Sequence, residues 1–146
     1  MKTLTLYRFA YDDDGGKTDF RTYDWLRANQ RHSACFASFD AALRFAKHAI
    51  LASLDAEATD RSLLFREGVE RHYDFADATW EVEDAPGIVT YTVPYRERTV
   101  EIDWASSTVE WSEWVESDYR AVREIHIDTL RLTVFDDLDN PTEAGT

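Results

Sequence analysis

Carboxylate side chains are the residues of this sequence whose type and spacing could do chemistry. Between residues 79 and 115 they recur at alternate positions, within short runs in which apolar residues also alternate. Alternate side chains of a strand face the same way, about 7 Å apart, so these carboxylates should form rows on one face of a sheet. The residues that we predict to bind a partner are Glu81, Glu83, Glu101, Asp103, Glu110 and Glu113.

Paired carboxylates can act as an acid and a base, but only when their surroundings differ. One carboxyl must be buried, so that its pKa is raised, while the other stays ionised. A uniform exposed row does not offer that contrast, and we therefore predict no catalytic residue and no enzymatic activity. Glu113 fits the row least well, because strict alternation turns it inward unless the strand bulges before Trp114.

Cysteine and histidine side chains do not form a recognisable site. His32 and Cys35 lie three residues apart, but a catalytic Cys–His pair usually comes from separate parts of a fold. We interpret Cys35 as a buried structural thiol. His72 and His126 lack the paired spacing of a zinc-binding helix, so we expect no metal and no cofactor.

The acidic run from Asp12 to Gly16 invites a comparison with calcium loops. An EF-hand loop needs a glutamate at its twelfth position, and counting from Asp12 that position is Tyr23. The run instead indicates an ordinary hairpin turn.

The composition indicates a folded and strongly acidic chain. Its 146 residues are 44% hydrophobic and 14% aromatic, which suits one domain with a sizeable core. The net charge of −13 repels nucleic acids and anionic membranes and attracts basic proteins. A single cysteine and an N-terminus without the apolar stretch of a signal peptide lead us to expect a cytoplasmic protein, in the host cytoplasm if a phage encodes it.

The pattern predicts an α+β fold built on a mainly antiparallel sheet. A helix over residues 39–56, capped by Ser38, carries apolar residues at helical spacing and should cover the apolar face of the sheet. Alternation predicts that one apolar face is shared by Trp80, Val82, Val100, Ile102, Trp104, Val109 and Trp111. The carboxylates would then occupy the opposite face.

The flanking segments are predicted in less detail. Residues 2–10 should form a strand, 18–23 its hairpin partner and 25–30 a short helix. Ser117 could cap a helical turn that ends at Val122.

The last apolar run changes phase along the chain. Ile125 and Ile127 share one parity and Leu130 takes the other, which predicts a bulge or a break near Asp128. We expect a single domain over residues 1–135 and an acidic flexible tail over 136–146.

The acidic row leads to a functional hypothesis. DNA carries one charge per roughly 3.4 Å of each strand, and carboxylates spaced by about 5 and 7 Å on a sheet come near that density. We therefore expect a binding protein that occupies the basic groove of a nucleic-acid-binding protein, without binding nucleic acid or membranes itself. Small acidic inhibitors of phages and mobile elements, including anti-CRISPR and anti-restriction proteins, are similar in size and charge, although no motif identifies one of those families.

Two alternatives remain open from the sequence. The acidity could be that of a housekeeping domain from a salt-adapted organism, which would fold poorly at low salt. The chain could also be a small enzyme or ligand-binding domain with an apolar pocket between helix and sheet, lined by His126 or His72.

Overall fold

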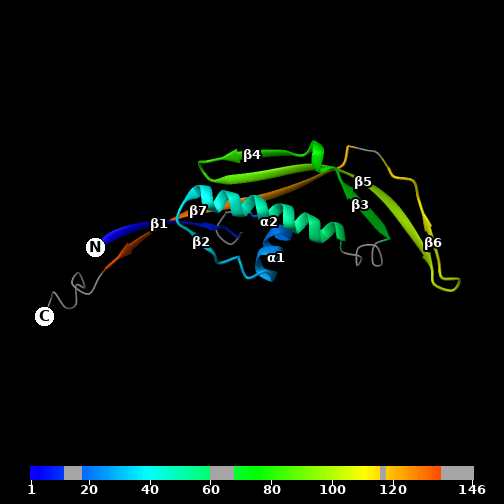
Figure 1. Ribbon diagram of the computed structural model, residues 1–146, viewed down its shortest axis with the longest axis horizontal. Coiled ribbons are helices and arrows are strands. Elements are labelled where there is room, and N and C mark those ends of the chain that lie inside the picture. The colour runs from blue at the N-terminus through cyan, green and yellow to red at the C-terminus, as the bar shows by residue number, and fades with distance from the viewer. Residues whose placement is uncertain (12–17, 60–67, 116–117, 136–146) are drawn as a thin grey trace.

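A computed structural model describes residues 1–11, 18–59, 68–115 and 118–135. The predicted class is confirmed: an antiparallel sheet carries one long helix on one face, with a second, shorter helix beside it (Figure 1). The elements are β1 (Lys2–Phe9), α1 (Phe20–Ala28), β2 (Cys35–Phe36), α2 (Phe39–Thr59), β3 (Val69–Tyr73), the 3-10 turn η2 (Phe75–Asp77), β4 (Thr79–Glu83), β5 (Ile88–Asp103), β6 (Thr108–Trp111) and β7 (Arg120–Val134).

The 16-residue strand β5 is the centre of the sheet. Along one edge it pairs first with β7 and then with β6, and along the other edge first with β4 and then with β3. Strand β1 adds to the far side of β7, and the two-residue β2 adds to β1. Because β5 and β7 are both long, the sheet is drawn out into an arm at each end (Figure 1).

Helix α2 covers the middle of the sheet and forms the core with it. The Ser38 hydroxyl accepts a hydrogen bond of 3.1 Å from the Ala41 amide, as expected of an N-cap. The predicted helix is confirmed, and it runs on to Thr59. Its small and branched residues pack on apolar side chains of β5 and β7. The buried residues of this contact include Ala42, Ala46, Ala49, Ile50, Leu54, Val89, Tyr91, Val93, Ile125 and Ile127.

The strand register divides the predicted apolar face into two. Trp80 lies opposite Tyr91, so it is on the side of the sheet that faces α2. Val100 lies opposite Trp111 and has the other parity in the same continuous strand, so it faces away from that side. The apolar positions of β5 therefore change face between Val93 and Val100.

Residues 18–23 form no strand, contrary to the prediction. Asp19 caps α1 instead, because its carboxylate accepts hydrogen bonds from the Thr22 amide at 2.9 Å and the Thr22 hydroxyl at 2.8 Å. The helix that was expected over residues 25–30 thus begins at Phe20 and ends at Ala28. Leu26 carries its inner face into the core.

The predicted bulge near Asp128 is also absent. Strand β7 pairs with β1 without a break, from Ile127 opposite Phe9 to Val134 opposite Lys2. The change of phase is therefore a real change of face: Ile127 is buried under α2, whereas the 44% exposed Leu132 lies on the opposite face of the arm.

Several predictions fall wholly or partly outside the described residues. These are the turn at 12–16, the tail at 136–146 and the start of the helical turn at Ser117. The end of that turn is wrong, because Arg120 already begins β7. Within the described residues, no helix is long and apolar enough to cross a membrane.

Candidate functional site

Three of the six predicted carboxylates lie together on the β5–β6 hairpin. Glu101 is directly opposite Glu110, and Asp103 is opposite Thr108, so the three acids share one face of this projecting arm (Figure 1). All three are exposed. Opposed side chains of a strand pair are about 5 Å apart, where two unit charges repel by roughly 0.8 kcal/mol even in bulk water. We call these three residues the acidic hairpin face.

Asp103 has a structural task as well as a charge. Its Oδ1 accepts hydrogen bonds from the amides of Ala105 at 3.0 Å and Ser106 at 3.3 Å, at the turn of the hairpin. Hydrogen bonds from the Ser106 side chain, the Ser106 amide and the Ala105 amide lower the pKa of Asp103 below its ordinary value. Asp103 thus stays ionised and fixes the turn.

Glu113 is exposed because the strand bulges after β6. Trp111 lies opposite Val100 and Val115 lies opposite Glu97, so four steps along this segment match three along β5. The sequence pattern predicted that Glu113 would turn inward unless the strand bulged before Trp114, and the structure has this bulge. It also leads the chain from β6 to β7 along the same edge of β5, where the Tyr95 amide donates to the Tyr119 carbonyl at 3.0 Å.

The other face of the hairpin carries tryptophan and arginine. The Arg98 guanidinium lies between two indoles, 3.8 Å from the centre of the Trp111 ring and 4.5 Å from that of Trp114. Arg98 also forms an ion pair of 3.0 Å with Glu70 on β3. Stacking of cations on aromatic rings stiffens this arm. At its tip, Trp104 is 73% exposed.

Glu81 and Glu83 do not join the acidic hairpin face. Glu81 is opposite Thr90, which in turn is opposite Glu124 on β7, so these acids lie on the face of the sheet away from α2. Glu101, by contrast, has the parity of the residues that face α2, although it lies on the projecting arm. The structure therefore brings Glu101, Asp103 and Glu110 together and places Glu81 and Glu83 elsewhere.

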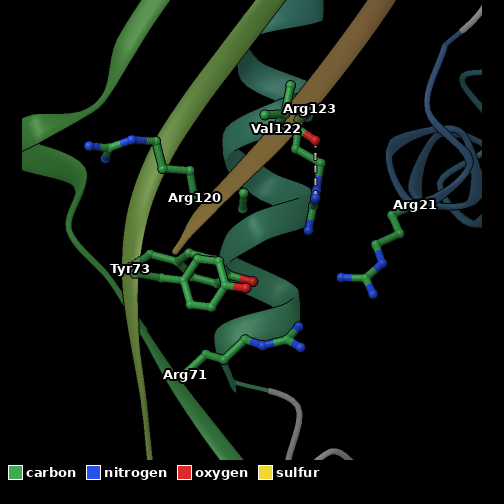
Figure 2. Close-up of a pocket in the computed structure, with 8 residues that line it drawn as sticks. Arg21, Arg71, Tyr73, Arg120, Val122 and Arg123 are labelled. Atoms are coloured by element: carbon green, nitrogen blue, oxygen red, sulfur yellow. Dashed lines mark hydrogen bonds between the residues drawn. The ribbon is translucent and has the colours of Figure 1, made fainter. Parts of the chain in front are cut away.

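A polar hollow that the sequence did not predict lies on the helix side of the sheet. It has a volume of about 230 Å³, and its lining side chains come from α1, β3, β5 and β7 (Figure 2). Its principal side chains are Arg21, Arg71, Tyr73, Tyr95 and Arg123. No sequence signal could have found it, because these residues are scattered over about a hundred positions and share no motif.

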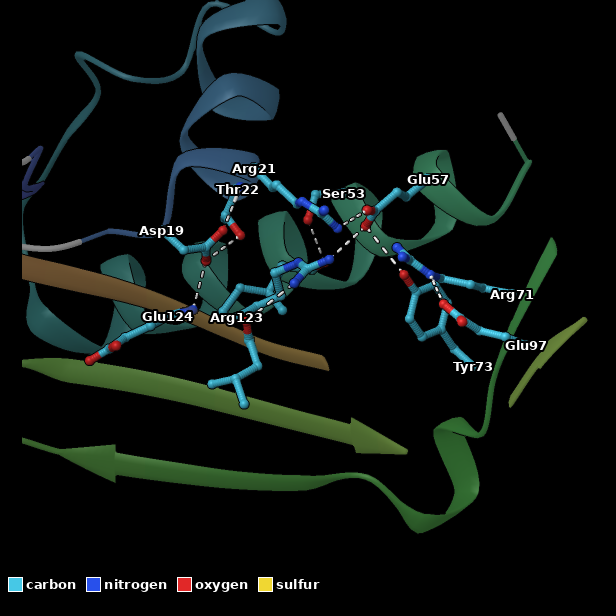
Figure 3. Close-up of polar contacts among 12 residues, drawn as sticks. Asp19, Arg21, Thr22, Ser53, Glu57, Arg71, Tyr73, Glu97, Arg123 and Glu124 are labelled. Atoms are coloured by element: carbon cyan, nitrogen blue, oxygen red, sulfur yellow. Dashed lines mark hydrogen bonds and ion pairs between the residues drawn. The ribbon is translucent and has the colours of Figure 1, made fainter. Parts of the chain in front are cut away.

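Glu57 on α2 holds the side chains beside this hollow in place. One carboxylate oxygen pairs with Arg21, and the other accepts from Arg123 at 2.7 Å and from the Tyr73 hydroxyl at 3.4 Å (Figure 3). Arg123 is 7% exposed, so this is a mostly buried charge pair. Beside it, Arg71 pairs with Glu97 at 2.7 Å.

The histidines and the cysteine lie away from this hollow. The His126 ring contacts Glu124 at 3.0 Å on the opposite face of the sheet, and His72 packs edge-on against Trp114. Neither lines the polar hollow. Cys35 is exposed on β2, so the prediction of a buried thiol is wrong.

Tyr73 makes the stability of the fold sensitive to alkaline pH. Burial, and then the nearby Glu57 carboxylate, raise the pKa of Tyr73 above its ordinary value of 10.0. The unfolded chain therefore loses this proton first, and the stability of the fold should fall as pH rises above about 10.

The variant Tyr73→Phe should flatten this decline in unfolding experiments between pH 9 and 12, leaving a smaller slope from Tyr91, whose pKa burial also raises. The exposed Tyr11→Phe is the control and should decline as the unaltered protein does. An unchanged slope in Tyr73→Phe would show that its proton is not linked to folding.

No protein-family model matches the chain, and searches of curated proteins and of solved structures found no match.

Proposed function

We propose that this protein is a non-catalytic binding protein that presents the acidic hairpin face to a basic surface on another protein. The observation that carries the proposal is the direct opposition of Glu101 and Glu110 on a projecting arm. Such a pair destabilises the free protein, and it becomes favourable when a cationic partner neutralises it.

The hairpin also offers apolar contacts for a partner. Trp104 is 73% exposed at the tip, and Val109 and Trp111, on the face of β6 opposite the acidic residues, are each more than two-fifths exposed. Tryptophan is enriched among the residues that dominate binding energy at protein interfaces. An acidic face with one exposed indole at the tip of the hairpin fits a partner that is both basic and able to accept a large aromatic side chain.

A nucleic-acid-binding protein is the partner class that this surface suits best. Its groove normally receives phosphates, and closely spaced carboxylates supply a comparable density of negative charge. A phage-encoded inhibitor of a host defence protein, acting in the host cytoplasm, would have this character. Glu81, Glu83 and Glu113 would then add long-range attraction from outside the contact.

The test separates stability from binding at one residue. Glu101→Lys turns a repulsive cross-strand pair into an attractive one, so it should raise the free energy of unfolding by up to about 1 kcal/mol. The same change should slow association with the partner by about tenfold or more at low salt. Asp24→Lys, at an exposed position on α1, makes the same charge change as a control and should preserve binding.

The binding assay is a pull-down from bacterial lysate at low and moderate salt, followed by kinetic measurements on the purified partner. Capture of a nucleic-acid-binding protein supports the proposal if duplex DNA displaces that protein and if the Glu101→Lys variant does not retain it. Equal retention by Glu101→Lys and the unaltered protein would rule out the acidic hairpin face as the interface. If this protein captures no partner and unfolds at low salt, the alternative of a salt-adapted housekeeping domain would be supported instead.

A further inference from the structure

Several arginine side chains approach one another around the polar hollow. Arg21 comes from α1, Arg71 from β3 and Arg123 from β7, and Figure 2 shows all three beside the same space, with the Tyr73 hydroxyl directed into it. Arg120 also borders the hollow, but its side chain extends away from it (Figure 2). The ligand would therefore meet three guanidinium groups.

These arginines are only partly neutralised. Arg21 and Arg123 share the single carboxylate of Glu57, and Arg71 pairs with Glu97. Among the described residues of this cluster, three cations thus face two anions, which leaves one positive charge there in a chain whose net charge is −13. The chain as a whole is acidic, but the surplus of positive charge at this hollow attracts a small anion.

The hydrogen-bonding capacity of the arginines is also not exhausted. The Nε atom of Arg71 donates to Glu97. Its two terminal nitrogens lie toward the hollow (Figure 2). Arg123 donates from one terminal nitrogen to Glu57 and from the other to the Val122 carbonyl at 3.2 Å, while its buried Nε has no partner within the described residues. A buried cation with incomplete pairing is costly, and a nearby anion reduces that cost.

We propose that this hollow binds a phosphoryl group, either as inorganic phosphate or as the phosphate of a monoester. A phosphoryl group presents several acceptor oxygens and up to two negative charges, which matches guanidinium groups that approach from three elements. At about 230 Å³ the hollow is smaller than the 300–1,000 Å³ of typical pockets for drug-sized ligands. It therefore takes the anionic head of a ligand and leaves the remainder outside. This site is independent of the acidic hairpin face.

Calorimetric titration of the full chain at constant ionic strength tests the assignment. The probes are inorganic phosphate, O-phosphoserine and malonate, a dicarboxylate without phosphorus. Saturable binding of phosphate or phosphoserine, at least tenfold tighter than malonate, is the expected result. Tighter binding of phosphoserine identifies an esterified phosphate as the ligand, and tighter binding of inorganic phosphate identifies the free ion. Equal binding shows that the site recognises the phosphoryl group alone. Failure of both phosphates to saturate, or malonate binding as tightly, would overturn the proposal.

Two variants on the same helix locate the site. Arg21→Gln should weaken phosphate binding by about tenfold, because it removes one charge-assisted contact from a partly exposed position that the fold tolerates. Arg27→Gln removes the same charge from another exposed part of α1 and should leave binding unchanged. A third variant, Arg71→Lys, keeps the positive charge but loses the planar guanidinium group and should also weaken binding. Equal loss in Arg21→Gln and Arg27→Gln would show a general charge effect and refute the site.

Discussion

Replacing Glu57 by glutamine is expected to lower the free energy of unfolding by about 3 kcal/mol, among the largest effects of any single substitution in this chain. Arg123 is 7% exposed and depends on Glu57 for its counter-charge. Without the carboxylate, a mostly buried guanidinium remains that cannot lose its proton and has lost its counter-charge. The Arg21 contact adds little to the loss, because that side chain is substantially solvated.

Equilibrium unfolding in urea measures this effect, and two further variants interpret it. Glu70→Gln breaks the more exposed pair with Arg98 and should cost less than about 1 kcal/mol. The double variant Glu57→Leu/Arg123→Met replaces the buried pair by apolar side chains and should recover most of the stability. If Glu57→Gln costs no more than Glu70→Gln, the buried pair is not a determinant of stability.

Alanine at Gly87 is expected to cost about 3 kcal/mol, because two separate effects act at this position. Gly87 has a φ of +91°, which side-chain-bearing residues rarely adopt. An added Cβ would also lie 2.5 Å from the Ile127 carbonyl oxygen, a backbone atom. The Gly87 carbonyl accepts from the Ile127 amide at 2.7 Å, so relief of the clash would strain the junction where β7 passes from β5 to β1.

A companion variant shows which of the two effects dominates. Asparagine tolerates positive φ better than alanine but carries the same Cβ. Equal losses in Gly87→Ala and Gly87→Asn, measured by urea unfolding, would identify the close approach to Ile127 as the cause. Recovery in Gly87→Asn would identify the backbone conformation. A loss below about 1 kcal/mol in both would show that the junction relaxes.

Local patterns predicted the elements well, but not the relation between distant parts of one strand. The alternation of Trp80 with Val82, and of Val100 with Ile102, is correct within each run. Whether two runs share a face depends on the residues between them, and β5 is continuous from Ile88 to Asp103. The prediction of one continuous acidic face failed for this reason.

The length of α2 explains where the apolar residues change face. Its 21 residues extend about 31 Å, which covers about nine residues of a strand. Past one end of the helix, the apolar residues of β7 change from one face of the strand to the other between Ile127 and Leu130. Past the other end, the apolar residues of β5 change face between Val93 and Val100. A sequence shows such a change of phase, but it cannot distinguish a bulge from the end of a covering helix.

Of the candidate sites, the sequence indicated one and gave no sign of the other. The carboxylates of the hairpin stand out because they alternate within a short run. The arginines of the polar hollow come from α1, β3 and β7, and only the tertiary fold brings them together. Glu57 could not be distinguished by its spacing from other acids on the surface of a helix.

The pairing of β1 with β7 has a consequence for the order in which the chain can fold. Lys2 lies opposite Val134, so this contact closes a loop of more than 130 residues. Contacts between residues so far apart form slowly, because the entropy of loop closure must be offset before the strands stabilise each other. During synthesis β1 leaves the ribosome long before β7 and must wait for it, while α2, β4 and β5 can already assemble. Strand β1 is therefore exposed to chaperones, proteases and other unfinished chains for longer than these elements are.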